Sequence, residues 1–186
     1  HLLAWTTTPW TLPGNTALAV NGDLEYISVE INGEKFVIAD DIFRAKALFV
    51  RAFGNEKGEL PPYKFGAKIK GSDLVGRSYE PLFEDRGENA HKVWHADYVS
   101  ADNGTGIVHL APAYGEEDFE LAKKEGIPVI HVLDEYGTYT EGDWKGLDVW
   151  ENNKRIAKEL KERGVVWKID YIQHEYPHNL RNGNRL

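Results

Sequence analysis

The chain has 186 residues, with 22 basic and 30 acidic side chains and a formal net charge of −8. Hydrophobic residues make up 41% and charged residues 28%, an ordinary globular composition that excludes disordered, collagen-like and coiled-coil chains. The acidic balance excludes a general attraction for a phosphate backbone, so a nucleic acid would have to be held at one local site.

Cysteine and methionine are both absent. Without cysteine there is no disulfide framework and no thiolate nucleophile, which favours a cytoplasmic location. Without methionine, we expect the chain to be a piece excised from a longer protein. Residues 1–22 carry no Asp, Glu, Lys or Arg, but Pro9, Pro13 and Gly14 interrupt the apolar run that a membrane span requires. No membrane partner is therefore expected.

Strand patterns dominate the first third of the chain, at residues 18–20, 25–31 and 35–39. Asn32-Gly33 separates the last two and tolerates the positive φ angles of a type I′ turn, which predicts a hairpin over residues 25–39. A helix is expected to begin at Asp40-Asp41, to end before Gly54 and to cover one side of the sheet.

Residues 55–91 are rich in turn signals and predict extended surface connections, with short strands at 67–70 and 73–75. Further strands are predicted at 92–100, 106–110, 128–133 and 165–171. Helices are predicted over 116–124, before Gly126, and over 151–163, with Gly164 as the C-cap. This pattern indicates one domain over residues 1–186, mainly β with peripheral helices (α+β), built around a closed or strongly curved, barrel-like sheet.

The first motif that points to chemistry is the segment Trp5-Thr6-Thr7-Thr8-Pro9-Trp10-Thr11-Leu12-Pro13. An edge strand explains it without any function, since threonine favours strands and proline is tolerated at sheet edges. In the functional interpretation, three successive hydroxyls enter a proline-stiffened bend and offer donors and acceptors to a polar, uncharged ligand end.

The second motif runs from Gly104 to Asp118. A glycine-flanked turn leads into a buried strand that carries His109, and a loop then leads to Asp118 at the start of a helix. Each has an ordinary alternative: a satisfied histidine of the sheet, and a first-turn helix acid. As a pair they would line one pocket, where the carboxylate holds a substrate ammonium and the imidazole forms or polarises the wall.

Metal binding is not predicted. His91 and His95 are four residues apart, as are His174 and His178, but the first pair lies in a strand pattern and Pro177 breaks the second. No nucleophile elbow, phosphate-binding loop or dinucleotide fingerprint occurs in the sequence, so no cofactor is predicted either.

Together the two motifs resemble the editing domain inserted into the catalytic domain of isoleucyl-tRNA synthetases, members of the class I aminoacyl-tRNA synthetases. The resemblance covers nearly the whole chain and extends to Tyr176-Pro177-His178. Valyl- and leucyl-tRNA synthetases share this domain, but their first motif resembles Thr-Thr-Arg-Pro. Thr8 and Trp10 therefore point to the isoleucine enzyme.

The resemblance implies post-transfer editing, the hydrolysis of the ester that joins a wrongly attached valine to isoleucine tRNA, with valyl-adenylate as an open second substrate. A hydrophobic pocket discriminates against a ligand lacking one methylene by only about 150-fold in this very family, so a second, smaller sieve is needed. The His-x-Gly-His and Lys-Met-Ser-Lys-Ser signatures of the synthetic site are absent. We therefore expect no ATP-dependent ligase activity from this chain alone.

The resemblance also implies roles for single residues. Asp118 matches the carboxylate that anchors the substrate α-ammonium, and His109 matches a residue at the side-chain pocket, where it would reject isoleucine by size. Thr6, Thr7 and Thr8 match the strand that would hold the terminal adenosine, the ester carbonyl and an attacking water. No strong base is evident, so we expect catalysis by positioning of water, helped by a ribose hydroxyl of the substrate.

Trp10 is assigned, by the same resemblance, to stacking or to pocket shape. Many relatives carry cysteines where this chain has Asn179 and Asn182, so no thiol or metal role is implied there. Two alternatives remain open: a non-catalytic module that docks the aminoacylated 3′ end, and an editing domain of valyl or leucyl specificity. The expected partners are the mischarged tRNA 3′ end and the remainder of the synthetase in cis.

The acidic balance predicts that the isolated chain binds tRNA weakly, because most phosphate contacts would lie elsewhere in the synthetase. We expect an affinity weaker than micromolar at physiological salt, measured by fluorescence anisotropy with labelled tRNA. Micromolar or tighter binding would contradict this expectation.

Overall fold

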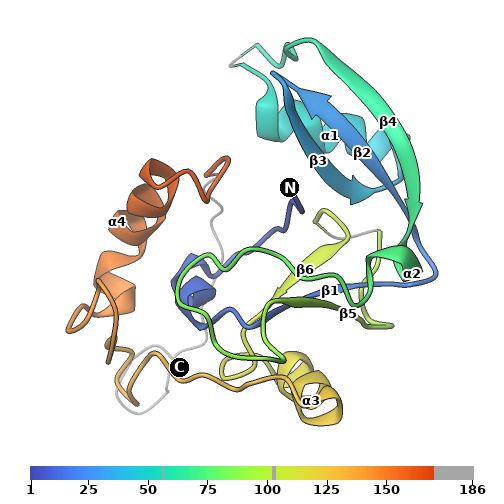
Figure 1. Cartoon of the computed structure of the whole chain (residues 1–186). Coiled ribbons are helices and arrows are strands. Elements are labelled where there is room, and N and C mark those ends of the chain that lie inside the picture. Colours follow the sequence, from blue (N-terminus) through green and yellow to red (C-terminus); the bar gives the residue numbers. More distant parts are fainter. Residues whose placement is uncertain (56, 102–103, 170–186) are drawn as a thin grey trace, which may run out of the picture.

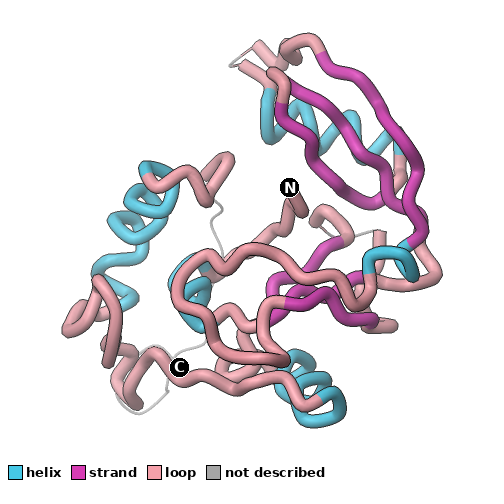
Figure 2. Tube along the Cα trace, in the orientation of Figure 1, coloured by secondary structure: helices cyan, strands magenta, loops and turns pink. Residues whose placement is uncertain are grey.

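The computed structural model describes residues 1–55, 57–101 and 104–169, which form two three-stranded sheets with helices around them (Figures 1 and 2). The elements in chain order are η1 (Pro9–Gly14), β1 (Ala17–Val20), β2 (Glu25–Ile31), β3 (Glu34–Ala39), α1 (Ile42–Phe53), β4 (Tyr63–Lys70), α2 (Gly71–Leu74), β5 (Lys92–His95), β6 (Ile107–Leu110), α3 (Glu116–Glu125) and α4 (Val149–Glu162).

One sheet has the strand order β3-β2-β4 and is antiparallel throughout. Its centre is the predicted hairpin of β2 and β3, which is confirmed, with Asn32 and Gly33 at φ angles of 52° and 83° in the turn. The alternating apolar residues of β2 share a buried cluster with Phe49 of α1. The helix therefore covers one side of this sheet, as predicted.

The other sheet has the order β5-β1-β6, with β1 parallel to β5 and antiparallel to β6. Alternation along β1 directs Ala17 and Ala19 toward α3, where they pack with Leu121. Leu18 and Val20 point to the opposite face and pack against residues of β2, β3 and α2. Burial on both faces explains why β1 is apolar along its whole length.

The N-terminal segment connects the two sheets. Leu2 forms a bridge with Val37 of β3, and Trp5 forms a parallel bridge with Val108 of β6. These are single residue pairs, and the named strands of the described chain form two separate sheets. The expected closed barrel is not found among them, because three strands are too few to close a sheet. The mixed α+β composition with peripheral helices is as predicted.

The connection from β4 to β5 differs from the prediction. The strand expected at 67–70 begins earlier, at Tyr63, and the strand expected at 73–75 is replaced by the short helix α2. Gly71 and Ser72 donate their N–H groups to the carbonyls of Leu24 and Gly22, at 2.8 and 3.0 Å. These contacts with the turn after β1 direct the chain out of the sheet.

Two later strand predictions need correction. The strand expected at 92–100 ends at His95, because the chain turns where Val99 donates to the carbonyl of Ala96. The strand expected at 128–133 is wrong. Val132 is buried, but the Tyr114 hydroxyl accepts the N–H groups of residues 132 and 133, at 2.7 and 3.0 Å, where a strand would use a neighbouring strand.

The predicted helices after residue 115 are confirmed. α3 ends at Gly126, whose φ of 70° is the left-handed conformation of a helix C-cap. α4 begins at the N-cap Asp148, and Gly164 follows its C-cap with a φ of 76°. The strand expected at 165–171 does not form over 165–169, where Val165 closes the helix end by donating to Leu160; residues 170–171 lie outside the described residues. Among the described helices, none is long and apolar enough to cross a membrane.

The turn before β6 yields a test of how the sheets fit together. A Cβ added at Gly106, whose φ is 73°, would lie 2.5 Å from the Cβ of Ala39, whereas Gly142 has a φ of 72° and open space around it. Both alanine substitutions carry a left-handed penalty of about 1–2 kcal/mol. We expect Gly106→Ala to cost about 2 kcal/mol more than Gly142→Ala in urea unfolding. Equal costs would show that the two sheets separate readily at this turn.

Candidate functional site

The threonine-rich segment lies beside the carboxyl end of β6. Because Trp5 pairs with Val108 in parallel, the chain from Thr6 onward continues along the last residues of that strand. It then bends into η1, with Thr8 as the N-cap and Pro9 in the first turn. Proline suits that position because its missing N–H would have no partner within the helix.

Three threonine hydroxyls form a row. Thr6 Oγ1 accepts the Thr8 N–H at 3.0 Å and lies 3.3 Å from Thr8 Oγ1. Thr8 Oγ1 in turn lies 3.3 Å from Thr11 Oγ1, and the Thr11 hydroxyl donates to the Thr8 carbonyl at 2.8 Å. Thr7 is exposed, and its hydroxyl has no hydrogen-bond partner in the part of the chain that the structure describes. Its hydroxyl is therefore available to a ligand or a water.

His109 of β6 closes this row in the interior, with 9% of the residue exposed. Its Nε2 lies 3.0 Å from Thr11 Oγ1, and its Nδ1 lies 2.8 Å from Asn15 Nδ2. The Asn15 amide nitrogen also faces the carbonyls of Ala17 and Leu110, at 2.8 and 3.2 Å, which identifies it as the NH₂ group. Its two protons serve His109 Nδ1 and the nearer Ala17 carbonyl, and the longer contact with Leu110 shares one of them. Nδ1 must therefore accept, and the neutral ring carries its proton on Nε2.

This tautomer sets the direction of the whole row. Thr11 Oγ1 accepts from His109 and gives its single proton to the Thr8 carbonyl, so Thr8 must be the donor in its contact with Thr11. Because Thr8 Oγ1 uses its single proton in the contact with Thr11, Thr6 must be the donor in its contact with Thr8. The hydroxyl dipoles near the bend are thus oriented before any ligand arrives, the condition under which they stabilise a developing charge at little reorganisation cost.

His109 is unsuited to act as a general base. Burial lowers its pKa from 6.5 to about 4. A second ring proton would have to sit on Nδ1, which faces the donor group of Asn15. The ring therefore stays neutral near pH 7 and serves to hold Thr11 and to form part of the wall behind the threonine segment.

Asn15 was not singled out from the sequence. It is 5% exposed, and its Oδ1 accepts the Tyr79 hydroxyl at 2.5 Å while its Nδ2 holds His109. The only feature of the sequence that could have pointed to Asn15 is its place as a polar residue between Pro13-Gly14 and a buried strand. Asparagine is common in such turns, so only its contacts distinguish this residue from a simple turn former.

Asp118 lies in the first turn of α3 and is partly buried. Its Oδ2 accepts the N–H of Ala111, the residue directly after β6, at 2.9 Å. Burial raises the pKa of Asp118, while the Ala111 N–H opposes that shift by favouring the carboxylate. The helix N-terminus also favours the ionised form. The arrangement fixes a negative charge at the end of β6.

The structure therefore links two of the predicted groups through one intervening hydroxyl and places the third at the same strand end. Thr8 and His109 are linked through Thr11, whereas Asp118 is bound to the backbone just beyond them. Leu110 packs against α3, so alternation points His109 to the other face of the sheet, and within the described residues His109 does not contact Asp118. The cavity expected between the hydroxyls and the carboxylate stays a prediction.

Trp10 lies in an aromatic cluster that joins η1 to α4. Its ring centroid is 5.8 Å from that of Tyr114, edge-on, and 5.8 Å from that of Trp150. The Tyr139 hydroxyl donates to its carbonyl at 2.8 Å. These contacts give Trp10 a packing function that holds the threonine bend in place. Its expected stacking on a ligand stays a prediction.

The histidine pairs considered for metal binding have other contacts. His91 and His95 accept hydrogen bonds from two different backbone N–H groups, at 3.2 and 2.9 Å. Across residues 1–55, 57–101 and 104–169, no group of three or more His, Cys, Asp or Glu side chains is arranged to hold a metal ion. His174 and His178 lie outside the described residues.

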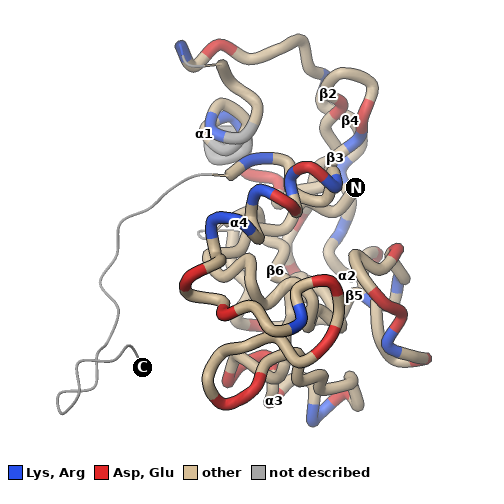
Figure 3. The backbone as a smooth tube through the Cα atoms, turned by 90° about the vertical axis from the view of Figure 1, so that its left-hand side faces the viewer, with Lys and Arg blue, Asp and Glu red and all other residues tan. Residues whose placement is uncertain are grey.

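α4 carries both acidic and basic residues (Figure 3). Three of the five cations on and just after α4 are paired with acids: Arg155 with Glu159, Lys158 with Glu162 and Arg163 with Asp143. This pairing lowers the attraction of the helix for phosphates.

Comparison with known sequences gives a consistent set of relatives. The family described as "Leucyl-tRNA synthetase, editing domain" matches residues 70–159. The isoleucine–tRNA ligases of Clostridium novyi and Pyrococcus abyssi are 43% and 42% identical over 97% of this chain, and that of Bdellovibrio bacteriovorus is 41% identical over 100%. The chain spans 17% of the length of each of these relatives.

Solved structures share the fold at low identity. The crystal structure of GlLeuRS-CP1 has a TM-score of 0.71 and 19% identity, covering 94% of this chain and 84% of that one. The editing domain of the P. falciparum cytosolic leucyl-tRNA synthetase has a TM-score of 0.66 and 14% identity, covering 87% of this chain and 76% of that one. The fold is therefore that of synthetase editing domains.

The low pKa of His109 predicts an acid-sensitive fold. Between pH 6.5 and about 4 the unfolded chain protonates this histidine and the folded chain does not, so stability is complete above pH 6.5 and falls on acidification. We expect the wild-type chain to lose about 2–3 kcal/mol more than His109→Gln between pH 7 and pH 4.5 in urea unfolding. The same pH dependence in both proteins would contradict the neutral, doubly bonded ring.

Proposed function

The chain belongs to the isoleucine–tRNA ligase family, as its editing domain, and on this premise we propose that it hydrolyses the ester that joins a misattached valine to isoleucine tRNA. The observation that carries the proposal is the convergence of polar groups at the carboxyl end of β6. The threonine hydroxyls run beside this strand end, and Asp118 is bound to the residue that follows it.

The need for such an activity follows from the size of the amino acids. Valine lacks one methylene of isoleucine, and a hydrophobic pocket rejects it by only about 150-fold, an established limit for this very enzyme. A smaller second site that admits valine and excludes isoleucine removes the remaining errors. His109, held at both ring nitrogens, is a rigid side chain suited to form part of the wall that excludes the larger substrate.

Asp118 would anchor the substrate. The ester of an amino acid carries an α-ammonium group, and a carboxylate fixed at the end of β6 would hold it by a charge-assisted hydrogen bond. Since the Ala111 N–H occupies one lone pair of Oδ2, the remaining lone pairs of the carboxylate are free to accept from the ammonium. Anchoring this end fixes where the ester carbonyl lies.

The threonine segment would then orient the reaction. A water attacks the ester carbonyl carbon, the ribose oxygen leaves with a proton, and the products are free valine and tRNA. Thr7, whose hydroxyl is exposed, is suited to hold the water or the carbonyl oxygen, and the row from Thr6 to Thr11 fixes the bend that presents it. Because His109 cannot serve as a strong base, rate enhancement comes from positioning and oriented dipoles, helped by a substrate ribose hydroxyl.

A second candidate is editing with leucyl or valyl specificity. The match of residues 70–159 to the leucyl editing-domain family favours it. Against it stand identities above 40% with isoleucine–tRNA ligases over nearly the whole chain, and the residues Thr8 and Trp10 in the first motif. A purely docking role for the aminoacylated 3′ end would show binding without turnover.

The remainder of the synthetase would act with this domain in cis. It would supply the ATP-dependent ligase activity and most contacts with tRNA phosphates, in keeping with the net charge of −8 here. We place this activity in the cytoplasm, where tRNA is aminoacylated. Valyl-adenylate would be a further substrate if the same pocket admits it.

The charge of Asp118 gives the direct test. Asp118→Asn keeps an oxygen that accepts the Ala111 N–H but removes the negative charge, so the fold should persist while deacylation of valyl-tRNA for isoleucine falls by about 100-fold or more. Glu117→Gln removes a charge from the exposed neighbour in the same helical turn and serves as the control. Single-turnover release of labelled valine, with the chain in excess, measures both.

Retained turnover in Asp118→Asn would refute the anchoring role, and absence of turnover in the wild-type chain with measurable binding would support the docking alternative. Release rates for valine, threonine and isoleucine esters then decide the specificity. Fast hydrolysis of the isoleucyl ester would eliminate the assignment to isoleucine editing.

A further inference from the structure

A loop outside both motifs binds the segment that leaves η1. Residues 78–91, which connect α2 to β5, contact this segment through three hydrogen bonds at 2.5, 3.5 and 2.7 Å. Two come from side chains and one from a backbone N–H. They join Tyr79 to Asn15, Arg86 to the Pro13 carbonyl and the His91 N–H to the Thr16 carbonyl.

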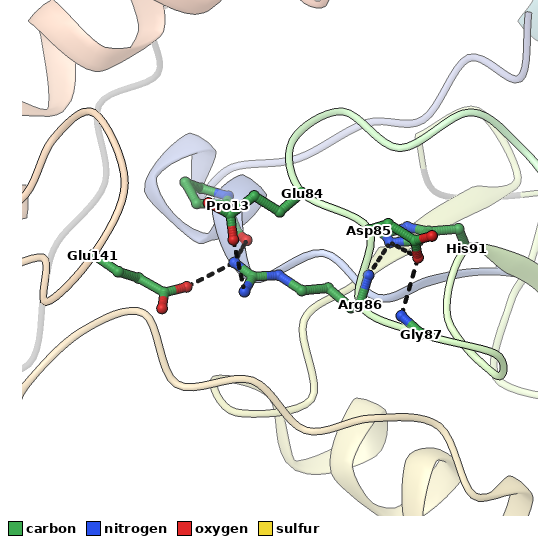
Figure 4. Close-up of polar contacts among 7 residues, drawn as sticks. All are labelled: Pro13, Glu84, Asp85, Arg86, Gly87, His91 and Glu141. Carbon is green, nitrogen blue, oxygen red and sulfur yellow. Dashed lines mark hydrogen bonds and ion pairs between the residues drawn. The ribbon is translucent and has the colours of Figure 1, made fainter.

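The loop is braced so that its position is defined. Arg86 is 14% exposed in its side chain and extends from the loop to Glu141, at 2.7 Å, with Glu84 at 3.3 Å (Figure 4). The Arg86 N–H donates to His91 Nε2 at 3.2 Å. The His91 ring packs edge-on against Tyr79, with ring centroids 5.6 Å apart. The loop thus holds the Tyr79 ring, and with it the hydroxyl, in one place.

Tyr79 is the member of this loop that reaches the site. Its hydroxyl satisfies the amide oxygen of Asn15, which leaves the amide nitrogen facing Nδ1 of His109. A buried amide oxygen without a donor carries a desolvation penalty. Loss of the Tyr79 hydroxyl would therefore loosen the Asn15 amide, whose nitrogen is otherwise held by the carbonyls of Ala17 and Leu110. The direction of the row from His109 to Thr11 depends on this orientation.

We propose that Tyr79 is a positioning residue of the editing site, which acts through Asn15 to fix the tautomer of His109 and the orientation of the threonine row. This inference rests on the proposed function for its effect on rate. Tyr79 touches no reacting atom in this scheme. Its hydroxyl sets the hydrogen-bond pattern behind the groups that do.

The kinetic test uses Tyr79→Phe in the 186-residue chain, because phenylalanine keeps the ring contact with His91 and removes only the hydroxyl. The maximal single-turnover rate of valyl ester hydrolysis should fall about tenfold, while the chain concentration that gives half the maximal rate stays unchanged. Tyr136→Phe, at a side chain that is 75% exposed, is the matched control and should change neither quantity. An unchanged rate in Tyr79→Phe would overturn the proposal.

The spectroscopic test is independent of editing. Nitrogen-15 chemical shifts of His109 report which ring nitrogen carries the proton, and the wild-type chain should show an unprotonated Nδ1. In Tyr79→Phe, the Nδ1 signal should shift or broaden as the Asn15 amide loses its fixed orientation. Unchanged His109 shifts would overturn the proposal even if the rate fell.

The two readouts separate the possible failures. If the wild-type chain hydrolyses no valyl ester, the proposed function fails, and the His109 shifts still decide whether Tyr79 controls the ring. As a further check, Tyr79→Phe should have no additional effect on rate in an Asn15→Ala background, because the path from the hydroxyl to the ring is already broken. Multiplicative losses would show that Tyr79 acts by another route.

Discussion

The hydrogen bonds that the buried imidazole of His109 must make organise the site. A histidine at 9% exposure needs a partner at each ring nitrogen, and His109 obtains them from Thr11, which lies within the short helix η1, and from Asn15, its C-cap. The same two bonds join η1 to β6, fix the tautomer and orient the hydroxyls of the threonine bend. A structural requirement and a chemical one are thus met by the same contacts.

The site also depends on the junction of the two sheets. The turn that leads into β6 is held from the other sheet, since Tyr26 donates to the Gly106 carbonyl at 2.8 Å and the Ala39 N–H donates to the Thr105 carbonyl at 2.9 Å. The N-terminal segment pairs with a strand of each sheet before it reaches the threonines. The position of the threonine-rich segment is therefore set by both sheets, and a local motif alone would not reproduce it.

The distribution of charge agrees with a site that recognises one end of a large substrate. In the proposed scheme the partly buried carboxylate of Asp118 would hold the substrate ammonium, and the other groups are neutral hydroxyls and a neutral imidazole. Two of the exposed cations of α4, Arg155 and Lys158, form ion pairs with neighbouring acids. In the proposed function, such a domain would gain specificity from shape and hydrogen bonds and would leave the long-range attraction of tRNA to other parts of a synthetase.

The sequence by itself determined the hairpin over 25–39, helices α1, α3 and α4, and the two motifs, because turn residues, caps and apolar periodicity are local signals. It could not determine that residues 132 and 133 would donate to the Tyr114 hydroxyl, that Asn15 would hold His109, or that Tyr79 would bind Asn15. Tertiary structure decided these, since each is a hydrogen bond between residues far apart in the chain. A buried polar group must find a partner, but only the fold selects which one.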